Sequence, residues 1–301
     1  MKAWVNGQFV EWDKANVSLL SHSFGRGSAI FEVLDIVETD NGPAFFGLNE
    51  HLDRFFNSAR LTFMDLPLNR EEIVRLLVET ALTNNVTEGL LKFFAYYPLI
   101  ELHATPANPQ VDIAVFSVDF KLFGIKQADL SAPVAAGIST FRKLHPDTVP
   151  VAAKVVGNYV NACLAKMEVK KRGFEDVIML DTRGFVAEGA TANVFLVKEG
   201  KVLTPTLRCA LAGVTRRTVL ELLRDMDMEP VETDIRPDVL TSAEEAFYTA
   251  SVIKVKPIKS IEGRPIGRSC PGPVTQAISD RLTEALRGRI DWFQKCLIPV
   301  K

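Results

Sequence analysis

The chain has 301 residues, of which 47% are hydrophobic and 24% are charged, and its formal net charge at pH 7 is −2. A chain of this length and composition is expected to fold as a globular protein with one large or two medium-sized domains. The slightly acidic balance excludes a basic face of the kind that binds nucleic acid.

Cysteines are few and far apart, and none belongs to a Cys-x-x-Cys pair. The four are Cys163, Cys209, Cys270 and Cys296. Such sparse use indicates a reducing compartment, and the four histidines show no metal-ligand spacing. The N-terminal stretch alternates apolar and polar side chains, and no apolar run of about 18 residues occurs. We therefore expect a cytoplasmic protein without a signal peptide, a membrane partner or a bound metal.

The first part of the chain predicts two helices and an antiparallel sheet. Strands are expected at 4–10, with a hairpin turn at Asn6-Gly7, and at 31–38, 44–46, 90–102 and 111–120. Helices are expected at 48–61 and at 69–84, where Asn69 and Glu72 form a capping box. Residues 18–28 are expected to form a polar loop. Two helices against an antiparallel sheet make an α+β domain.

The pattern lapses between residues 121 and 133, which we interpret as a connection between domains. Beyond it, strands are expected at 135–140, 176–180, 185–197, 201–204, 231–235 and 246–250. Helices are expected after Asn158, with apolar residues at helical spacing, and at 214–226 and 273–287. We therefore predict a small domain over residues 1–122, a connection over 123–133 and a larger domain over 134–301.

One lysine, Lys154, stands out by its surroundings. It follows the apolar run VPVAA at 149–153 and precedes the Gly-Asn-Tyr start of a helix. A lysine kept away from water can lose its proton and act as a nucleophile toward an aldehyde. The alternative is a solvated surface charge, as is usual for most of the 35 lysines and arginines.

A carboxylate, Glu188, follows 34 residues later at the end of a predicted strand, in the run EGATAN. A carboxylate that pairs with a pyridine nitrogen keeps it protonated, so that the ring withdraws electrons. The alternative is a solvated carboxylate at the end of a strand.

The segment Gly213-Val214-Thr215 begins a predicted helix and could bind an anion. Free backbone N–H groups, a threonine hydroxyl and the positive end of the helix dipole favour a phosphate at such a place. Ala250-Ser251 ends another strand and could donate to the same phosphate. Each feature also has an ordinary interpretation, since glycine is common where a helix begins.

Taken together, these pieces resemble the class IV, or fold type IV, pyridoxal-phosphate aminotransferases, most closely the branched-chain amino-acid aminotransferases. The resemblance covers nearly the whole chain, and the order of its motifs is highly specific. The motifs are SHSFGRGSAIFE, FGLNEHLDRFFNSARL, VPVAAKVVGNY, FVAEGATANVFLV, LTPTL, LAGVTR, EEAFYTAS, KPIKSIEGRPIG and GPVTQ. The resemblance implies a two-domain α+β fold like that of D-amino-acid aminotransferases, with a small α/β sandwich and a larger β-barrel-like domain. It also implies a site between the domains and at least a homodimer.

The resemblance further implies pyridoxal 5′-phosphate as the cofactor and assigns roles by matching position. Lys154 matches the lysine that binds the cofactor covalently and moves the proton at the substrate's α-carbon. Tyr159 matches the tyrosine that hydrogen-bonds the cofactor's phenolic oxygen, and Glu188 matches the carboxylate on the pyridine nitrogen. Leu211 would pack near the ring. The phosphate-binding positions are Arg54, Gly213, Val214, Thr215, Ala250 and Ser251.

The substrate side departs from the branched-chain pattern. The family's Tyr-x-Arg-Pro motif ends here in Tyr97-Pro98, and its Phe-Glu-Gly-x-Arg motif reads FEVLD at 31–35. Arg26 stands where a first-domain tyrosine is usual, and Val156 stands where glycine is common. We hypothesise that Arg26 binds a substrate carboxylate, the alternative being an arginine on the surface of a loop. The other predicted substrate contacts are Phe31, Tyr97 and Val252.

These features predict a transaminase that moves an amino group between an amino acid, foremost one of the branched-chain type, and a 2-oxo acid such as 2-oxoglutarate. Two alternatives on the same fold are a D-amino-acid aminotransferase and an aminodeoxychorismate lyase-like enzyme, which FEVLDI favours because it lacks the usual glycine and arginine. A catalytically lapsed homologue that serves as a scaffold is a third. The presence of Lys154, Tyr159 and Glu188 argues against it.

Overall fold

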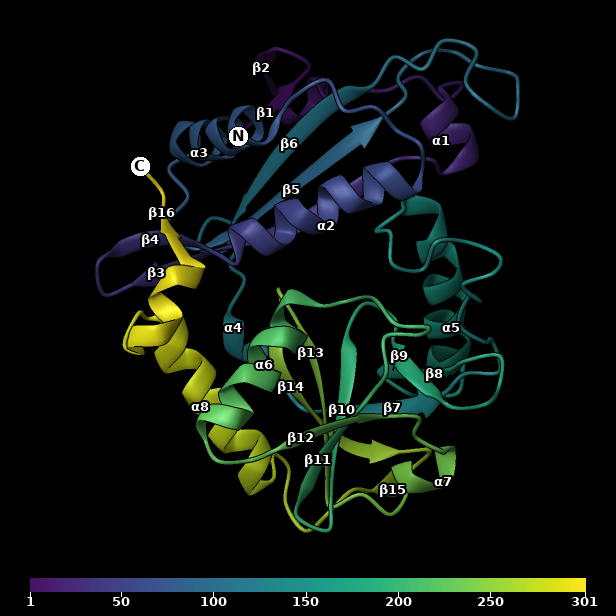
Figure 1. Ribbon diagram of the computed structural model, residues 1–301, viewed down its shortest axis with the longest axis vertical. Helices are drawn as coiled ribbons and strands as arrows, with labels where there is room; N and C mark the ends of the chain where they lie inside the picture. The colour runs from purple at the N-terminus through teal and green to yellow at the C-terminus, as the bar shows by residue number, and fades with distance from the viewer. The chain divides into compact units, whose positions relative to one another are not determined.

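The computed structural model describes all 301 residues, and the chain divides by its contacts into two compact units. Unit 1 comprises Met1–Ile125, Ala153–Gly157 and Ala285–Lys301, and unit 2 comprises Lys126–Ala152 and Asn158–Glu284. Each unit combines helices with one sheet, which confirms the α+β class (Figure 1). The change at residue 125 falls inside the predicted connection, but two short segments beyond it belong to unit 1.

The sheet of unit 1 has seven antiparallel strands in the order β16-β4-β3-β5-β6-β1-β2 (Figure 1). The strands are β1 (Lys2–Val5), β2 (Gln8–Glu11), β3 (Ile30–Thr39), β4 (Gly42–Phe46), β5 (Gly89–Tyr96), β6 (Asp112–Asp119) and β16 (Leu297–Pro299). The hairpin at Asn6-Gly7 is confirmed, and both residues have the positive φ that its tight turn requires. Because β16 pairs with β4, the end of the chain joins this unit.

Three α-helices belong to unit 1, and two of them follow the predicted bounds. They are α1 (His22–Arg26), α2 (Leu48–Leu61) and α3 (Arg70–Thr83), with the 3-10 helices η1 (Trp12–Lys14) and η3 (Asp291–Cys296). The capping box of Asn69 and Glu72 is present at the start of α3. Helix α1 lies unpredicted inside the expected loop, where Ser21 caps its first turn and Gly27 ends it with a φ of 66°. The strand expected to reach residue 102 ends at Tyr96, because Pro98 cannot donate to the ladder.

One face of this sheet forms the core of unit 1. Helix α2 contacts β3, and α3 contacts β1 and β6. The rings of Phe55 on α2 and Phe93 on β5 meet edge to face with their centroids 4.9 Å apart, and both are fully buried. Successive side chains of a strand point to opposite faces. The other face of the sheet therefore carries Phe31, Lys92 and Phe94.

The sheet of unit 2 has nine strands in the order β12-β11-β10-β13-β14-β7-β8-β9, with β15 paired to β14. The strands are β7 (Val134–Ile138), β8 (Asp176–Leu180), β9 (Val186–Gly189), β10 (Asn193–Lys198), β11 (Lys201–Pro205), β12 (Pro230–Thr233), β13 (Glu245–Ala250), β14 (Lys254–Ile261) and β15 (Arg264–Pro265). The sheet curls until its edge strand β9 contacts β10 and β11, which gives the expected barrel-like form.

Unit 2 also contains the remaining helices. They are α4 (Gln127–Leu130), η2 (Val156–Asn158), α5 (Tyr159–Lys171), α6 (Val214–Asp225), α7 (Pro237–Leu240) and α8 (Pro273–Leu286), of which η2 and α8 extend across the division into unit 1. Helix α5 packs on β7 and β8 through small residues, among them Ala162 and Ala165. Its apolar residues at helical spacing, Val160, Leu164 and Met167, are exposed instead of buried.

The single strand predicted for 185–197 was wrong, because it is two strands, β9 and β10. Residues 190–192 form a tight turn, closed by a hydrogen bond of 2.7 Å from Gly189 N to Ala192 O. The turn is built of alanine and threonine, which give no sequence signal for a break. Strand β14 also has no counterpart among the predicted elements.

We expect Phe93→Ala to lower the free energy of unfolding by about 3–5 kcal/mol, because it removes a ring from a fully buried site and leaves a cavity. The matched control is Phe63→Ala, since the side chain of Phe63 is 92% exposed. Its effect should stay within about 0.5 kcal/mol. Urea unfolding of both variants measures the difference, and equal losses for the two would contradict the assignment of the core.

Candidate functional site

A buried carboxylate joins β3 to α2 in unit 1. Glu32 is fully buried, and its two oxygens accept hydrogen bonds from Nε and Nη2 of Arg54 at 2.7 and 2.8 Å. The Nδ1 atom of His51 lies 2.8 Å from the second oxygen. A two-point contact of this kind fixes both the position and the plane of a guanidinium group. Arg54, the predicted phosphate-binding residue, is therefore held rigidly on α2.

The charges around Glu32 decide its protonation. Burial alone would raise the pKa of its carboxyl, but the charge of Arg54, the hydrogen bonds of Arg54 and the contact with His51 hold that pKa well below its usual range. Glu32 is thus an anion at neutral pH. The sequence does not reveal this role, because Glu32 stands out there only as part of the altered motif FEVLD.

Lys154 is attached to the same helix and strand. Its N–H donates to Ser58 Oγ on α2 at 2.9 Å, and its C=O accepts from Phe31 N on β3 at 3.0 Å. Its Nζ lies 4.7 Å from the centroid of the Phe31 ring. These contacts explain why the short segment around Lys154 groups with unit 1.

Close backbone packing also holds this segment. Gly157 N donates to Gly27 O at 2.9 Å. A Cβ at Gly27 would lie 2.8 Å from the Cα of Gly157, which is too near for any side chain. The glycine at the end of SHSFGRG therefore has a packing reason, beyond its positive φ of 66°.

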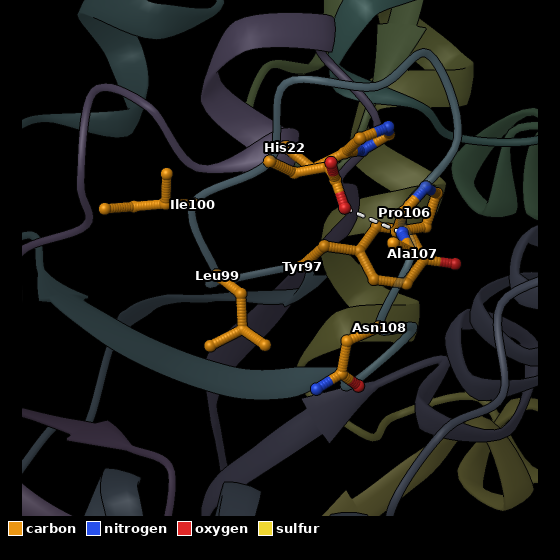
Figure 2. A pocket seen from close by; sticks show the side chains of 8 residues that line it. His22, Tyr97, Leu99, Ile100, Pro106, Ala107 and Asn108 are labelled. Carbon is orange, nitrogen blue, oxygen red and sulfur yellow. Dashed lines mark hydrogen bonds between the residues drawn. The ribbon is translucent and has the colours of Figure 1, made fainter.

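Tyr97, which stands at the family's arginine position, is buried beside a cavity of about 300 Å³ (Figure 2). Its N–H donates to Ser23 Oγ at 2.8 Å, and its ring meets that of His22 edge to face at 5.5 Å. The residues that line the cavity are His22, Tyr97, Leu99, Ile100, Glu101, Pro106, Ala107 and Asn108. No lysine or arginine is among them, and Glu101 is an anion that accepts from Ala107 N at 2.7 Å. The cavity therefore offers no cation to a carboxylate.

The other predicted substrate residues differ in their surroundings. Arg26 is exposed, and its guanidinium donates to the backbone oxygens of Gly25 and Leu102 at 3.3 and 3.2 Å. Phe31 is buried and stacks on Phe94 with centroids 5.9 Å apart. Val252, in unit 2, accepts a hydrogen bond from Gln127 Nε2 through its backbone oxygen. The structure brings Phe31 to Lys154 and keeps Arg26 on loop carbonyls.

In unit 2, Glu188 is held by three donors near the end of β9. Lys143 Nζ lies 2.5 Å from its first oxygen, and the second accepts from Leu211 N at 3.1 Å and from Asn193 Nδ2 at 3.3 Å. Glu188 is only 5% exposed, so the ordinary interpretation of a solvated carboxylate does not apply. An ionised carboxylate can accept about four hydrogen bonds, which leaves room for one more donor. Sequence reasoning missed Lys143 and Asn193, because such long-range contacts leave no local pattern.

The start of α6 is shaped to bind an anion. Gly213 is its N-cap and has no side chain to satisfy the first N–H groups of the helix. A Cβ at Gly213 would lie 2.1 Å from Asn193 Oδ1, so only glycine fits there. Val214 and Thr215 follow as the first two helical residues. Thr215 is 1% exposed, and its buried hydroxyl has no hydrogen-bond partner. A buried hydroxyl without a partner at a helix N-terminus fits a phosphate oxygen.

The end of β13 carries a buried hydroxyl that the sequence did not single out. The hydroxyl of Thr249 is buried without a partner, and Thr249 pairs with Asn193 across the sheet. Ser251 follows Ala250, the last residue of β13, and its backbone oxygen accepts from Lys254 Nζ at 2.7 Å.

Tyr159, the predicted partner of the phenolic oxygen, is half-buried and begins α5. It follows Lys154 by five residues, after the short helix η2. The position agrees with the expected start of a helix after the Gly-Asn-Tyr turn.

These donor sets fit pyridoxal phosphate. The start of α6 supplies unsatisfied donors for a phosphate, and Glu188 supplies an anion for a ring nitrogen. Lys154 supplies an amine for an aldehyde. The structure contains no helix long and apolar enough to cross a bilayer, and no cluster of three or more side chains that could hold a metal ion.

Comparison with known proteins gives the same family. The family model "Amino-transferase class IV" matches residues 29–261. The chain is 30% identical over 288 residues to the branched-chain-amino-acid aminotransferase of Pseudomonas aeruginosa, covering 96% of this chain and 94% of that protein. The branched-chain aminotransferase of Thermoproteus uzoniensis, solved with norvaline, has a TM-score of 0.93 and 30% identity, covering 100% of this chain and 99% of that one. The branched-chain enzyme of T.th., complexed with N-(5′-phosphopyridoxyl)-L-glutamate, has a TM-score of 0.93 and 31% identity, covering 100% and 98%.

We expect Glu32→Gln to lower the free energy of unfolding at pH 7 by about 3–5 kcal/mol, because Arg54 loses its buried anion. The effect depends on pH with a definite sign. Since the pKa of Glu32 is depressed in the folded state, its stabilisation is complete above the unfolded value of about 4.3 and is lost as the pH falls toward the depressed pKa.

Denaturant unfolding of the parent and the variant between neutral and acidic pH measures this effect. The parent should lose stability on acidification more steeply than Glu32→Gln, so that the two curves converge. The matched control is Glu38→Gln, an exposed residue of the same strand, which should follow the parent. Parallel curves for the parent and Glu32→Gln would show that the folded carboxyl has an ordinary pKa.

Proposed function

Because the chain belongs to the class IV aminotransferases, which are pyridoxal-phosphate enzymes, we propose that it transfers the amino group of a branched-chain L-amino acid to a 2-oxo acid such as 2-oxoglutarate. The support for this substrate class is that the relatives compared above are branched-chain aminotransferases. One of them is complexed with a phosphopyridoxyl derivative of L-glutamate. The alternatives of a D-amino-acid aminotransferase and an aminodeoxychorismate lyase-like enzyme are not favoured.

The observation that carries the cofactor assignment is the position of Asn193. Its Nδ2 donates to Glu188 and to Leu211 O, while its Oδ1 abuts the Cα of Gly213, where α6 begins. One side chain thus links the proposed ring-nitrogen partner to the proposed phosphate site. Neighbouring residues can therefore hold both ends of one small cofactor.

The roles of the residues follow from their chemistry. Bound pyridoxal phosphate supplies an electron-withdrawing ring that makes the α-hydrogen of the substrate acidic. We assign to Lys154 the covalent attachment of the aldehyde carbon and, after the substrate displaces it, the movement of the α-proton. Glu188 keeps the ring nitrogen protonated, and Tyr159 donates to the phenolic oxygen. The residues assigned to the phosphate are Arg54, Gly213, Val214, Thr215, Ala250 and Ser251.

The proposed carboxylate contact of Arg26 has a structural condition. Its guanidinium would have to leave the carbonyl oxygens of Gly25 and Leu102, which it binds in the present arrangement. Phe31, Tyr97 and Val252 would act as apolar or shaping contacts of the substrate.

Borohydride reduction of the protein loaded with pyridoxal phosphate tests the role of Lys154. Reduction should fix a phosphopyridoxyl group on the peptide that contains Lys154, as measured by mass spectrometry, and Lys154→Ala should carry none. The control Lys166→Ala, at a lysine of α5 that pairs with Asp176, should keep the adduct. An adduct on another lysine, or none after added cofactor, would refute the assignment.

We also propose that the chain works as a homodimer in the cytoplasm. Two paired segments of unit 1 expose a group of large apolar side chains, a pattern typical of an association surface. They are Leu19, Leu20, Ile100 and Leu102. In unit 2, the exposed apolar residues of α5 form a second such group. Four free cysteines support a reducing compartment.

Substitution within the exposed group tests the dimer. We expect Leu20→Glu to shift the protein from dimer to monomer in sedimentation velocity, at a concentration at which the parent is dimeric, because a buried unpaired charge is costly. Leu20 is 56% exposed, and the control Leu82→Glu changes a residue of α3 with a similar exposed fraction of 52%. If the parent is a monomer, or if both variants stay dimeric, this surface does not join two copies.

A further inference from the structure

Lys92 is a charged residue in the middle of an apolar strand. It lies on β5, GLLKFFAY, which runs between β3 and β6 near the middle of the sheet of unit 1. Its side chain shares the face that carries Phe31 and Phe94, opposite to the face covered by α2 and α3. A lysine at this position costs stability unless it has a role, because such sites favour β-branched and aromatic residues.

The ammonium group of Lys92 rests between two aromatic rings. Its Nζ lies 5.2 Å from the centroid of Phe31 and 5.0 Å from that of Phe94. Lys92 is half-buried and takes part in no ion pair or side-chain hydrogen bond. Burial lowers the pKa of its amino group. The two rings stabilise a cation only partly, so the group is ready to bind an anion.

The Phe31 ring brings this cation to the reaction centre. The Nζ of Lys154 lies 4.7 Å from the centroid of the same ring, so the two amino groups flank one side chain. A substrate that reacts at Lys154 has its carboxylate on the carbon next to the new bond. An anion within a few ångströms of Lys154 can therefore reach Lys92.

The other cations of unit 1 that could bind this carboxylate are engaged elsewhere. The family's arginine position is Tyr97, whose cavity contains no cation. Arg26 donates to backbone oxygens, and the guanidinium of Arg54 is held by Glu32. We propose that Lys92 binds a carboxylate of the substrate and replaces the arginine that this chain lacks. This inference rests on the proposed transamination, and it names the cation that positions the substrate.

Binding of an unreactive acid tests the contact directly. The probe is 4-methylpentanoic acid, which keeps the carboxylate and side chain of leucine but has no amino group to react. Lys92→Met removes the charge and keeps the length of the side chain. It should raise the dissociation constant of the cofactor-loaded protein for this acid about tenfold to a hundredfold, the range of a hydrogen bond to a charged group.

Two controls separate charge from structure. Lys92→Arg keeps the cation and should bind the acid within about threefold of the parent. Lys121→Met removes the charge of an exposed lysine in the same unit and should change nothing. If Lys92→Met does not fold, Lys92→Gln replaces it. Unchanged affinity in the folded variant would overturn the proposal.

Steady-state kinetics identify which carboxylate is bound. A rise in KM for both leucine and glutamate, with kcat within about threefold of the parent, would assign Lys92 to the α-carboxylate. A rise for glutamate alone would assign it to the distal carboxylate, and either result supports the contact. An unchanged KM for both substrates would overturn it. If the parent protein itself neither loads the cofactor nor turns over, the proposed function has failed, and not this inference alone.

Discussion

A single buried anion, Glu32, attaches α2 to β3, and the chemistry of unit 1 depends on that attachment. It binds the guanidinium of Arg54 at two points and contacts His51. One turn further along α2, Ser58 accepts the N–H of Lys154, while Phe31, the residue before Glu32, donates to the Lys154 carbonyl. Arg54 and Lys154 are thus placed by the same strand and helix. A change in the packing of α2 on β3 would displace both.

In unit 2, the corresponding constraint is the side chain of Asn193. It contacts Glu188 and the backbone of Leu211, and it fills the space that a side chain at residue 213 would need. Lys143 supplies the charge that balances Glu188 in its buried place. The hydroxyl of Thr215 remains without a partner. A network that is satisfied around Glu188 and unsatisfied at the start of α6 is what a site needs before an anion binds.

The sequence predicts elements well where a local signal marks both ends. Helix α2 and the capping box of α3 are examples, since amphipathic spacing and Asn69 are local features. Prediction fails where the deciding contact is distant in the chain. The partners Lys143 of Glu188 and Glu32 of Arg54 lie 45 and 22 residues away from them. Lys92 has no distinguishing signal in the sequence, because alternation reports a face of the sheet but not what lies on it.

The central claim is that this chain transfers the amino group of a branched-chain L-amino acid to its cofactor. The most direct measurement is a single turnover of the cofactor-loaded protein with L-leucine in the absence of any 2-oxo acid, with D-leucine in parallel. Products are quantified by mass spectrometry. We expect one equivalent of 4-methyl-2-oxopentanoate and one of pyridoxamine phosphate per subunit from L-leucine, and neither from D-leucine. Conversion of D-leucine alone, or no conversion of either by a fully loaded protein, would contradict the account.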